Sequence, residues 1–161
     1  MKLRHVYFDY LFDRLLSMNV WRLMGGSLVF FYLNSMFWNV LAQILQSESL
    51  FSGTEKLNAG DPYFFVFVAP FLETLVFQYW LLHILLKNFK PGIAVVLSGL
   101  LFACMHQYNL YYMMAAFLPG VFFAAIVYAK GFLANNKLFA VLLVYVIHSL
   151  NNGFAFILKN L

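Results

Sequence analysis

The chain has 161 residues, of which 64% are hydrophobic and only 10% are charged. Soluble domains carry about 25% charged residues, so this composition, with a mean hydropathy of +0.81, excludes a soluble globular protein and indicates an integral membrane protein. The net charge of +4 is small and scattered along the chain. It argues against nucleic acid as a partner and is typical of basic loops that orient membrane spans.

The first segment, residues 1–22, combines charged residues at spacings of three and four with apolar side chains between them. This pattern is typical of an amphipathic helix in the membrane interface. It equally fits a polar cap that leads into the first span. We therefore divide the chain into an N-terminal amphipathic segment, residues 1–22, and a membrane domain, residues 23–161.

Five apolar runs follow, which predict an all-α fold: a polytopic bundle of about five transmembrane helices. The spans are expected at residues 23–45, 63–86, 92 to 106–109, 112–129 and 138–158. The loops between them alternate between basic and non-basic. By the positive-inside rule this alternation predicts a cytoplasmic N-terminus and an external C-terminus.

Small residues recur every four positions on two of these runs, with Gly99 and Ala103 on the third and Ala116, Gly120 and Ala124 on the fourth. Residues four apart lie on one face of a helix. A face of small side chains lets two helix backbones approach closely. We therefore expect the third and fourth spans to pack tightly at these positions.

Glu73 lies in the middle of the second run and is the only acidic residue beyond Pro62. A lone carboxylate in hydrocarbon is costly, so it is rarely found there without a partner or a function. Pro70 stands three residues earlier and removes an intrahelical hydrogen bond. An opening of the helix at this depth usually lines a cavity.

Two other runs carry hydrogen-bonding side chains that match Glu73 in depth: His106 on the third, and His148 with Asn152 on the fifth. His148 and Asn152 are four apart and share one helix face. At about 1.5 Å per residue, all these groups overlap between the midplane and the outer half of the bilayer. Either histidine alone fits a structural role, but their coincidence with the only acid favours a shared site.

A buried carboxylate can take a proton from water and later give it to a leaving amine. Imidazole and amide groups can donate hydrogen bonds to a carbonyl oxygen that becomes negative during attack. The candidate catalytic residues therefore suit amide hydrolysis by an activated water, without a cofactor: Glu73, His106, His148 and Asn152.

Two other arrangements of catalytic groups stay open. Glu73, His106 and His148 could instead bind a divalent metal such as Zn, with water as the fourth ligand. Cys104 could act as a nucleophile, but Cys104 and His106 are two residues apart and project to nearly opposite sides of a helix.

These residues resemble the motifs of the CAAX protease and bacteriocin-processing (CPBP) family of intramembrane proteases. That family carries Glu-Glu-x-x-x-Arg, Phe-x-x-x-His and His-x-x-x-Asn/Asp on successive spans. Glu73 matches the first Glu, residues 102–106 match the second motif and residues 148–152 match the third. The resemblance covers roughly residues 65–156.

The resemblance implies that Glu73 activates water, while the two histidines and Asn152 complete the site and stabilise the oxyanion. Two positions depart from the family pattern. Thr74 stands where the second Glu is expected, and Gln78 stands where the Arg is expected. This departure predicts the loss of a supporting ion pair and puts the substrate class, and to a lesser degree the activity, in question.

The resemblance further implies an intramembrane endopeptidase, with a bacterial inner membrane as its expected location. The short chain is similar to small sorting proteases of the myxosortase kind. Its expected partners are therefore the lipid bilayer and a membrane-anchored protein that is cleaved near a C-terminal sorting segment. The alternatives are a non-catalytic immunity or scaffold protein of the same family, a metal-dependent CAAX-type prenyl-protein protease and, less favoured, a small-solute carrier, which would be expected to show an inverted repeat.

Overall fold

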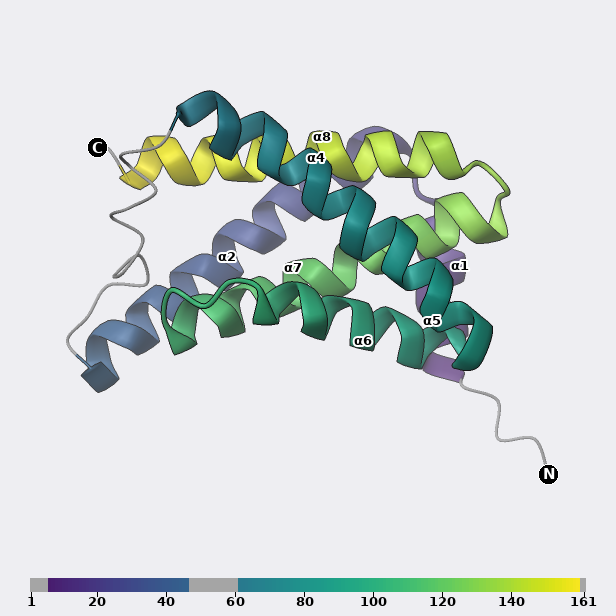
Figure 1. The fold of residues 1–161 in the computed structure, drawn as a ribbon, viewed down its shortest axis with the longest axis horizontal. Helices are drawn as coiled ribbons and strands as arrows, with labels where there is room; N and C mark the ends of the chain where they lie inside the picture. Colours follow the sequence, from purple (N-terminus) through teal and green to yellow (C-terminus); the bar gives the residue numbers. More distant parts are fainter. Residues whose placement is uncertain (1–5, 47–60, 160–161) are drawn as a thin grey trace.

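The computed structural model describes residues 6–46 and 61–159, and all regular structure in these two ranges is helical (Figure 1). Two helices come first: α1 (Val6–Ser17) and α2 (Val20–Gln46). The next helix runs without interruption from Phe64 to Asn88 in four pieces: η1 (Phe64–Val68), α4 (Ala69–Glu73), η2 (Thr74–Leu81) and α5 (Leu82–Asn88). The last elements are α6 (Pro91–Cys104), α7 (Leu110–Ile126), its π-helical continuation η3 (Val127–Leu133), and α8 (Lys137–Lys159).

Four of the described helices are long and apolar enough to cross a membrane: α2, the helix Phe64–Asn88, α7 with η3, and α8. The remaining apolar helix, α6, has 14 residues. At 1.5 Å per residue its length is about 21 Å, whereas the hydrocarbon core is about 30 Å thick. The predicted all-α polytopic bundle is confirmed, with its third apolar run folded as this shorter helix, and the protein is an integral membrane protein.

The third helix ends earlier than the sequence predicts, because α6 stops at Cys104 and does not reach His106. The amides of Met105 and His106 bond to the carbonyl oxygens of Phe102 and Ala103, three residues back, at 3.2 and 2.9 Å. Such tight bonds close the last turn of a helix. His106 therefore lies in the turn between α6 and α7, just beyond the helix.

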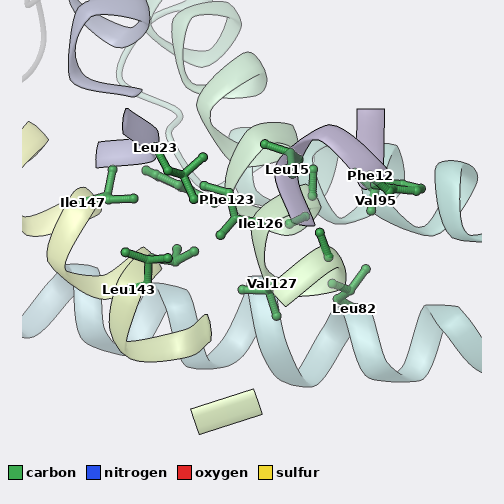
Figure 2. Close-up of a cluster of buried hydrophobic side chains, with 14 of the residues drawn as sticks. Phe12, Leu15, Leu23, Leu82, Val95, Phe123, Ile126, Val127, Leu143 and Ile147 are labelled. Atoms are coloured by element: carbon green, nitrogen blue, oxygen red, sulfur yellow. The ribbon is translucent and has the colours of Figure 1, made fainter. Parts of the chain in front are cut away.

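The apolar core lies where α1, α2, α5, α6, α7 with η3, and α8 meet (Figure 2). Ten buried side chains mark it: Phe12, Leu15, Leu23, Leu82, Val95, Phe123, Ile126, Val127, Leu143 and Ile147. Each helix contributes only one face, and many apolar side chains on the opposite faces are exposed. Such outer faces are expected where a helix bundle meets lipid.

The N-terminal segment packs onto this core through α1. Phe12 lies edge-on to Tyr128 of η3, with ring centroids 4.6 Å apart. Lys130 Nζ donates hydrogen bonds to the carbonyl oxygens of Leu16 and Met18, both at 2.7 Å, and so places a cation at the C-terminal end of α1. The amphipathic pattern thus produces a helix with a packed face, while its location in the membrane interface stays a prediction.

The small residues of α6 and α7 meet where the two helices cross. A Cβ atom added to Gly99 would overlap the backbone of Val121. A Cβ atom added to Gly120 would lie 3.0 Å from the Gly99 carbonyl oxygen and 2.7 Å from Cδ1 of Phe102. The predicted close approach is therefore present, and Gly120 also leaves the space that the Phe102 ring occupies.

Pro70 does not break its helix, which continues past it to cross α8 and reach α6 (Figure 1). The helix is not opened at Pro70 itself. Instead, it widens into π-helical turns on both sides of α4. Before Pro70, the Ala69 amide bonds to the carbonyl of Phe64, five residues back. After Glu73, the π-helical stretch η2 begins at once. Such widened turns occur frequently at functional sites.

Candidate active site

Glu73, at the end of α4, faces His148 of α8. Its Oε2 atom lies 3.4 Å from His148 Nε2. The His148 side chain is only 4% exposed, while that of Glu73 is 28% exposed. The only acidic residue of the second span is therefore in contact with the histidine of the last span.

Two aromatic rings fix the orientation of His148. The ring centroid of Phe123 of α7 lies 4.9 Å from that of the imidazole. The ring centroid of Phe102 of α6 lies 5.7 Å from it, with an interplanar angle of 69°. Nδ1 of His148 is buried and has no hydrogen-bond partner among the residues that the structure describes. Packing against these two rings thus positions the imidazole. Among the described residues, its polar contact is with Glu73.

His106 is held by its own helix end. Its Nδ1 atom lies 2.9 Å from the carbonyl oxygen of Phe102. Because a carbonyl only accepts, Nδ1 must carry the hydrogen, and Nε2 of the neutral ring is left as an acceptor. The site therefore contains an imidazole that can accept a hydrogen bond from water at Nε2.

Tyr112 is a site residue that the sequence analysis did not single out. Its ring stacks on His106, with centroids 5.9 Å apart and an interplanar angle of 23°. Asn109 caps α7 by accepting the Tyr112 amide hydrogen at 2.8 Å, which fixes the ring beside the end of α6. The signal in the sequence is this capping Asn three residues before an aromatic side chain.

Asn152 connects α8 to the start of the second span. Its Nδ2 atom donates a hydrogen bond to the carbonyl of Phe65 in η1 at 3.1 Å. A side-chain amide has two N–H donors, so this bond uses one of them and fixes the direction of the other. Asn151, which the sequence analysis passed over, lines the same cavity as Asn152.

A cavity of about 90 Å³ joins these groups, and this volume is ample for water. His106, His148 and Asn152 all line it, together with Tyr112. Glu73 does not line the cavity, but it contacts His148, which does. Three of the four predicted residues therefore share one cavity, and the fourth is in contact with one of those three.

Thr74 and Gln78, which replace charged residues of the family motif, are both fully buried. Gln78 lies beside Ser98 of α6, whose hydroxyl donates to the Phe77 carbonyl at 2.8 Å and lies 3.3 Å from Gln78 Oε1. Thr74 Oγ1 and Gln78 Nε2 have no partner within the described ranges. The position of the family's charged pair is therefore occupied by neutral groups, and an unpaired charge buried here would be far more costly.

The candidate metal ligands do not form a cluster. Within residues 6–46 and 61–159, no group of three or more His, Cys, Asp or Glu side chains has a geometry that could hold a metal ion. The three residues suggested as ligands are Glu73, His106 and His148. We therefore derive no chemical step through a metal.

A membrane-embedded helix bundle with a carboxylate–imidazole pair beside a small cavity suits acid–base chemistry within the membrane. Residues 58–154, more than half of the chain, match the family model for type II CAAX prenyl endopeptidase Rce1-like proteins. The chain therefore belongs to the Rce1-like family, whose members are intramembrane proteases. No curated protein and no solved structure shows significant similarity to it.

The family match includes all four predicted site residues, Glu73, His106, His148 and Asn152. It confirms the CAAX-protease resemblance at the level of the family. It also supports a protein substrate embedded in the lipid bilayer.

Proposed function

We propose that the protein hydrolyses a peptide bond in a membrane-anchored protein, near a C-terminal sorting segment, with a water activated by Glu73. The observation that carries this proposal is the contact between Glu73 Oε2 and His148 Nε2 at 3.4 Å, beside a water-sized cavity. The pair brings together a proton acceptor and a hydrogen-bonding imidazole on two different helices. Such a pair, set where bulk water is excluded, suits general acid–base catalysis.

In the first step, the Glu73 carboxylate takes a proton from water while the water oxygen forms a bond to the substrate carbonyl carbon. His106 supports this step, because its Nε2 acceptor can orient the second hydrogen of that water. The carbonyl electrons move to oxygen and leave an oxyanion. In the second step, the protonated Glu73 gives its proton to the peptide nitrogen, the C–N bond breaks, and a carboxylic acid and an amine are released.

The oxyanion needs donors that are already in place before the reaction. His148 is suited to this role when Nε2 carries its hydrogen, because the Phe102 and Phe123 rings hold the imidazole in one orientation. The second N–H of the Asn152 amide is a further donor, and its direction is set by the bond to Phe65. Together they would supply two hydrogen bonds from one face of α8.

The proposal is tested by comparing cells that produce the wild-type protein with cells that produce Glu73→Gln, which keeps the size of the side chain. Profiling the C-termini of membrane proteins in both strains identifies the substrate and its cleavage site. We expect one or a few proteins to be cleaved only with the wild type. Identical profiles, with both variants present in the membrane at equal amounts, would contradict the proposal and favour a non-catalytic scaffold or immunity role.

Metal dependence is tested separately, on the purified protein in detergent. We expect cleavage to persist after incubation with a strong chelator, with no stoichiometric metal by elemental analysis. Loss of cleavage on chelation, with recovery on adding Zn²⁺ alone, would instead show that the reaction depends on a metal.

A further inference from the structure

Beside the catalytic cavity lies an apolar groove of about 610 Å³, which we call the lateral groove. It is formed by α2, η1 and α8, and α2 lies outside the part of the chain that matches the family model. Its lining residues are Leu28, Val29, Tyr32, Val66, Phe67, Ser149, Leu150, Asn151, Gly153, Phe154 and Ile157. Several of these, among them Val29, Phe67 and Ile157, are about half exposed, so the groove opens on the lipid-facing side of the bundle.

The lateral groove adjoins the catalytic cavity. Tyr32, Asn151 and Phe154 line both of them. A chain that lies in the groove therefore contacts residues that also line the cavity of His148. The groove is thus placed to present one end of its occupant to the catalytic residues.

One buried polar group in the groove lacks a hydrogen-bond partner among the described residues. Ser27, Ser98 and Ser149 are the buried serines in the described part of the chain. Ser27 donates to the Leu23 carbonyl, and Ser98 donates to the Phe77 carbonyl. Ser149 is only 7% exposed, and its hydroxyl has no hydrogen-bond partner within residues 6–46 and 61–159. A hydrocarbon chain cannot bond to this hydroxyl, whereas a peptide backbone can.

Gly153, one turn beyond Ser149, leaves the floor of the groove open. A Cβ atom at Gly153 would meet only Cγ1 of Val66, at an ordinary contact distance of 3.5 Å. The packing of the described chain therefore does not require glycine here, unlike at Gly99 and Gly120. A small residue beside an unpaired hydroxyl lets another backbone approach closely.

We propose that the lateral groove binds an extended apolar peptide segment of the substrate, with the Ser149 hydroxyl bonding to its backbone and Gly153 admitting it. This inference rests on the proposed proteolytic function, because the occupant is the segment next to the cleaved bond. A prenyl or lipid chain would fill the apolar walls and leave Ser149 without a partner. Ser149 and Gly153 are thus specificity residues.

The test measures binding in the Glu73→Gln variant, so that it does not depend on cleavage. In a Cys104→Ala background, an NBD fluorophore is attached at Phe67→Cys in the groove or at Leu142→Cys on α8, outside the groove lining. These positions are matched, with exposures of 45% and 46%. The proteins are placed in vesicles of doxyl-labelled phosphatidylcholine, whose acyl chains quench the fluorophore. The probe is a short alternating Leu-Ala peptide, too short to span the membrane as a helix, compared with farnesylcysteine.

We expect the peptide to relieve quenching at position 67 but not at position 142. Ser149→Ala raises the half-maximal peptide concentration about 3- to 10-fold, the effect of one hydrogen bond. Gly153→Leu abolishes the relief at position 67, and unchanged lipid quenching at position 142 in the same variant serves as the folding control.

No relief at position 67, equal relief at both positions, or an unchanged half-maximal concentration in Ser149→Ala overturns the inference. Relief by farnesylcysteine that Ser149→Ala leaves unaffected also overturns it, because the groove would then bind hydrocarbon. Peptide binding with no cleavage by the wild type would contradict the proposed function and leave this binding site standing. Cleavage without peptide binding would contradict this binding site and leave the proposed function standing.

Discussion

The interface between α6 and α7 and the interface between the helix Phe64–Asn88 and α8 are built in opposite ways. The first is a crossing of Gly99 and Gly120, where even one added carbon atom has no room. The second contains polar atoms that are buried without a hydrogen-bond partner among the described residues, including Glu73 Oε2, His148 Nδ1 and Ser149 Oγ. Close packing fixes the scaffold, while the unsatisfied polar groups lie beside the cavity and the groove where we propose that water and substrate bind.

The two interfaces meet at Phe102. Gly120 leaves room for its ring, which lies against both His106 and His148. Its carbonyl oxygen binds His106 Nδ1. The tight crossing therefore positions the imidazoles of the polar interface, and changes on the two sides should have different effects.

The largest effect is expected from His148→Ala. It removes the imidazole that faces Glu73, so we expect cleavage of the substrate to fall by about 100-fold or more. The matched control is His83→Ala, because His83 is exposed and stacks on Phe132, with centroids 5.7 Å apart. Rates measured on both purified variants check this prediction. Equal effects of the two substitutions would contradict the role of His148.

The next effect separates the glycine crossing from the groove. Gly120→Ala should lower the free energy of unfolding by about 1–3 kcal/mol, because its methyl group collides with Phe102 and Gly99. Gly153→Ala should leave it unchanged or raise it by about 0.5–1 kcal/mol, because Ala loses less backbone entropy in a helix. Unfolding in mixed detergent micelles measures both. Equal destabilisation would show that the two interfaces are packed alike.

The smallest effect is expected from Thr74→Val. The Thr74 hydroxyl is buried and has no partner among the described residues, so a methyl group of the same shape should change stability by about 1 kcal/mol or less, towards a more stable protein. Cleavage should stay within a few-fold of the wild type. A large loss of cleavage would show that the Thr74 hydroxyl contributes to the reaction at the position of the family's second Glu.

The helical class could be predicted from the sequence, and so could the grouping of four polar residues in one candidate site: Glu73, His106, His148 and Asn152. Hydrophobic runs and four-residue spacings are local signals. The small-residue packing faces that contain Gly99 and Gly120 could be predicted for the same reason, whereas the crossing of these two faces could not.

The remaining features depend on which helix faces which. The stacking of Tyr112 on His106, the bond from Asn152 to Phe65 and the lateral groove all join segments that are distant in sequence or lie across a turn. The end of α6 at Cys104 depends on two tight backbone bonds that no side-chain pattern indicates. The widened turns around Pro70 likewise follow from backbone hydrogen bonding.

The most direct test of the account is the single-turnover cleavage rate of purified Glu73→Gln, measured on the substrate that the C-terminal profiles identify. The amide keeps the shape of the carboxylate but cannot take a proton from water. The account predicts a rate at least about 100-fold below that of the wild type, with unfolding in detergent unchanged within about 1 kcal/mol. A rate within about threefold of the wild type would contradict the role of Glu73 as the group that activates water.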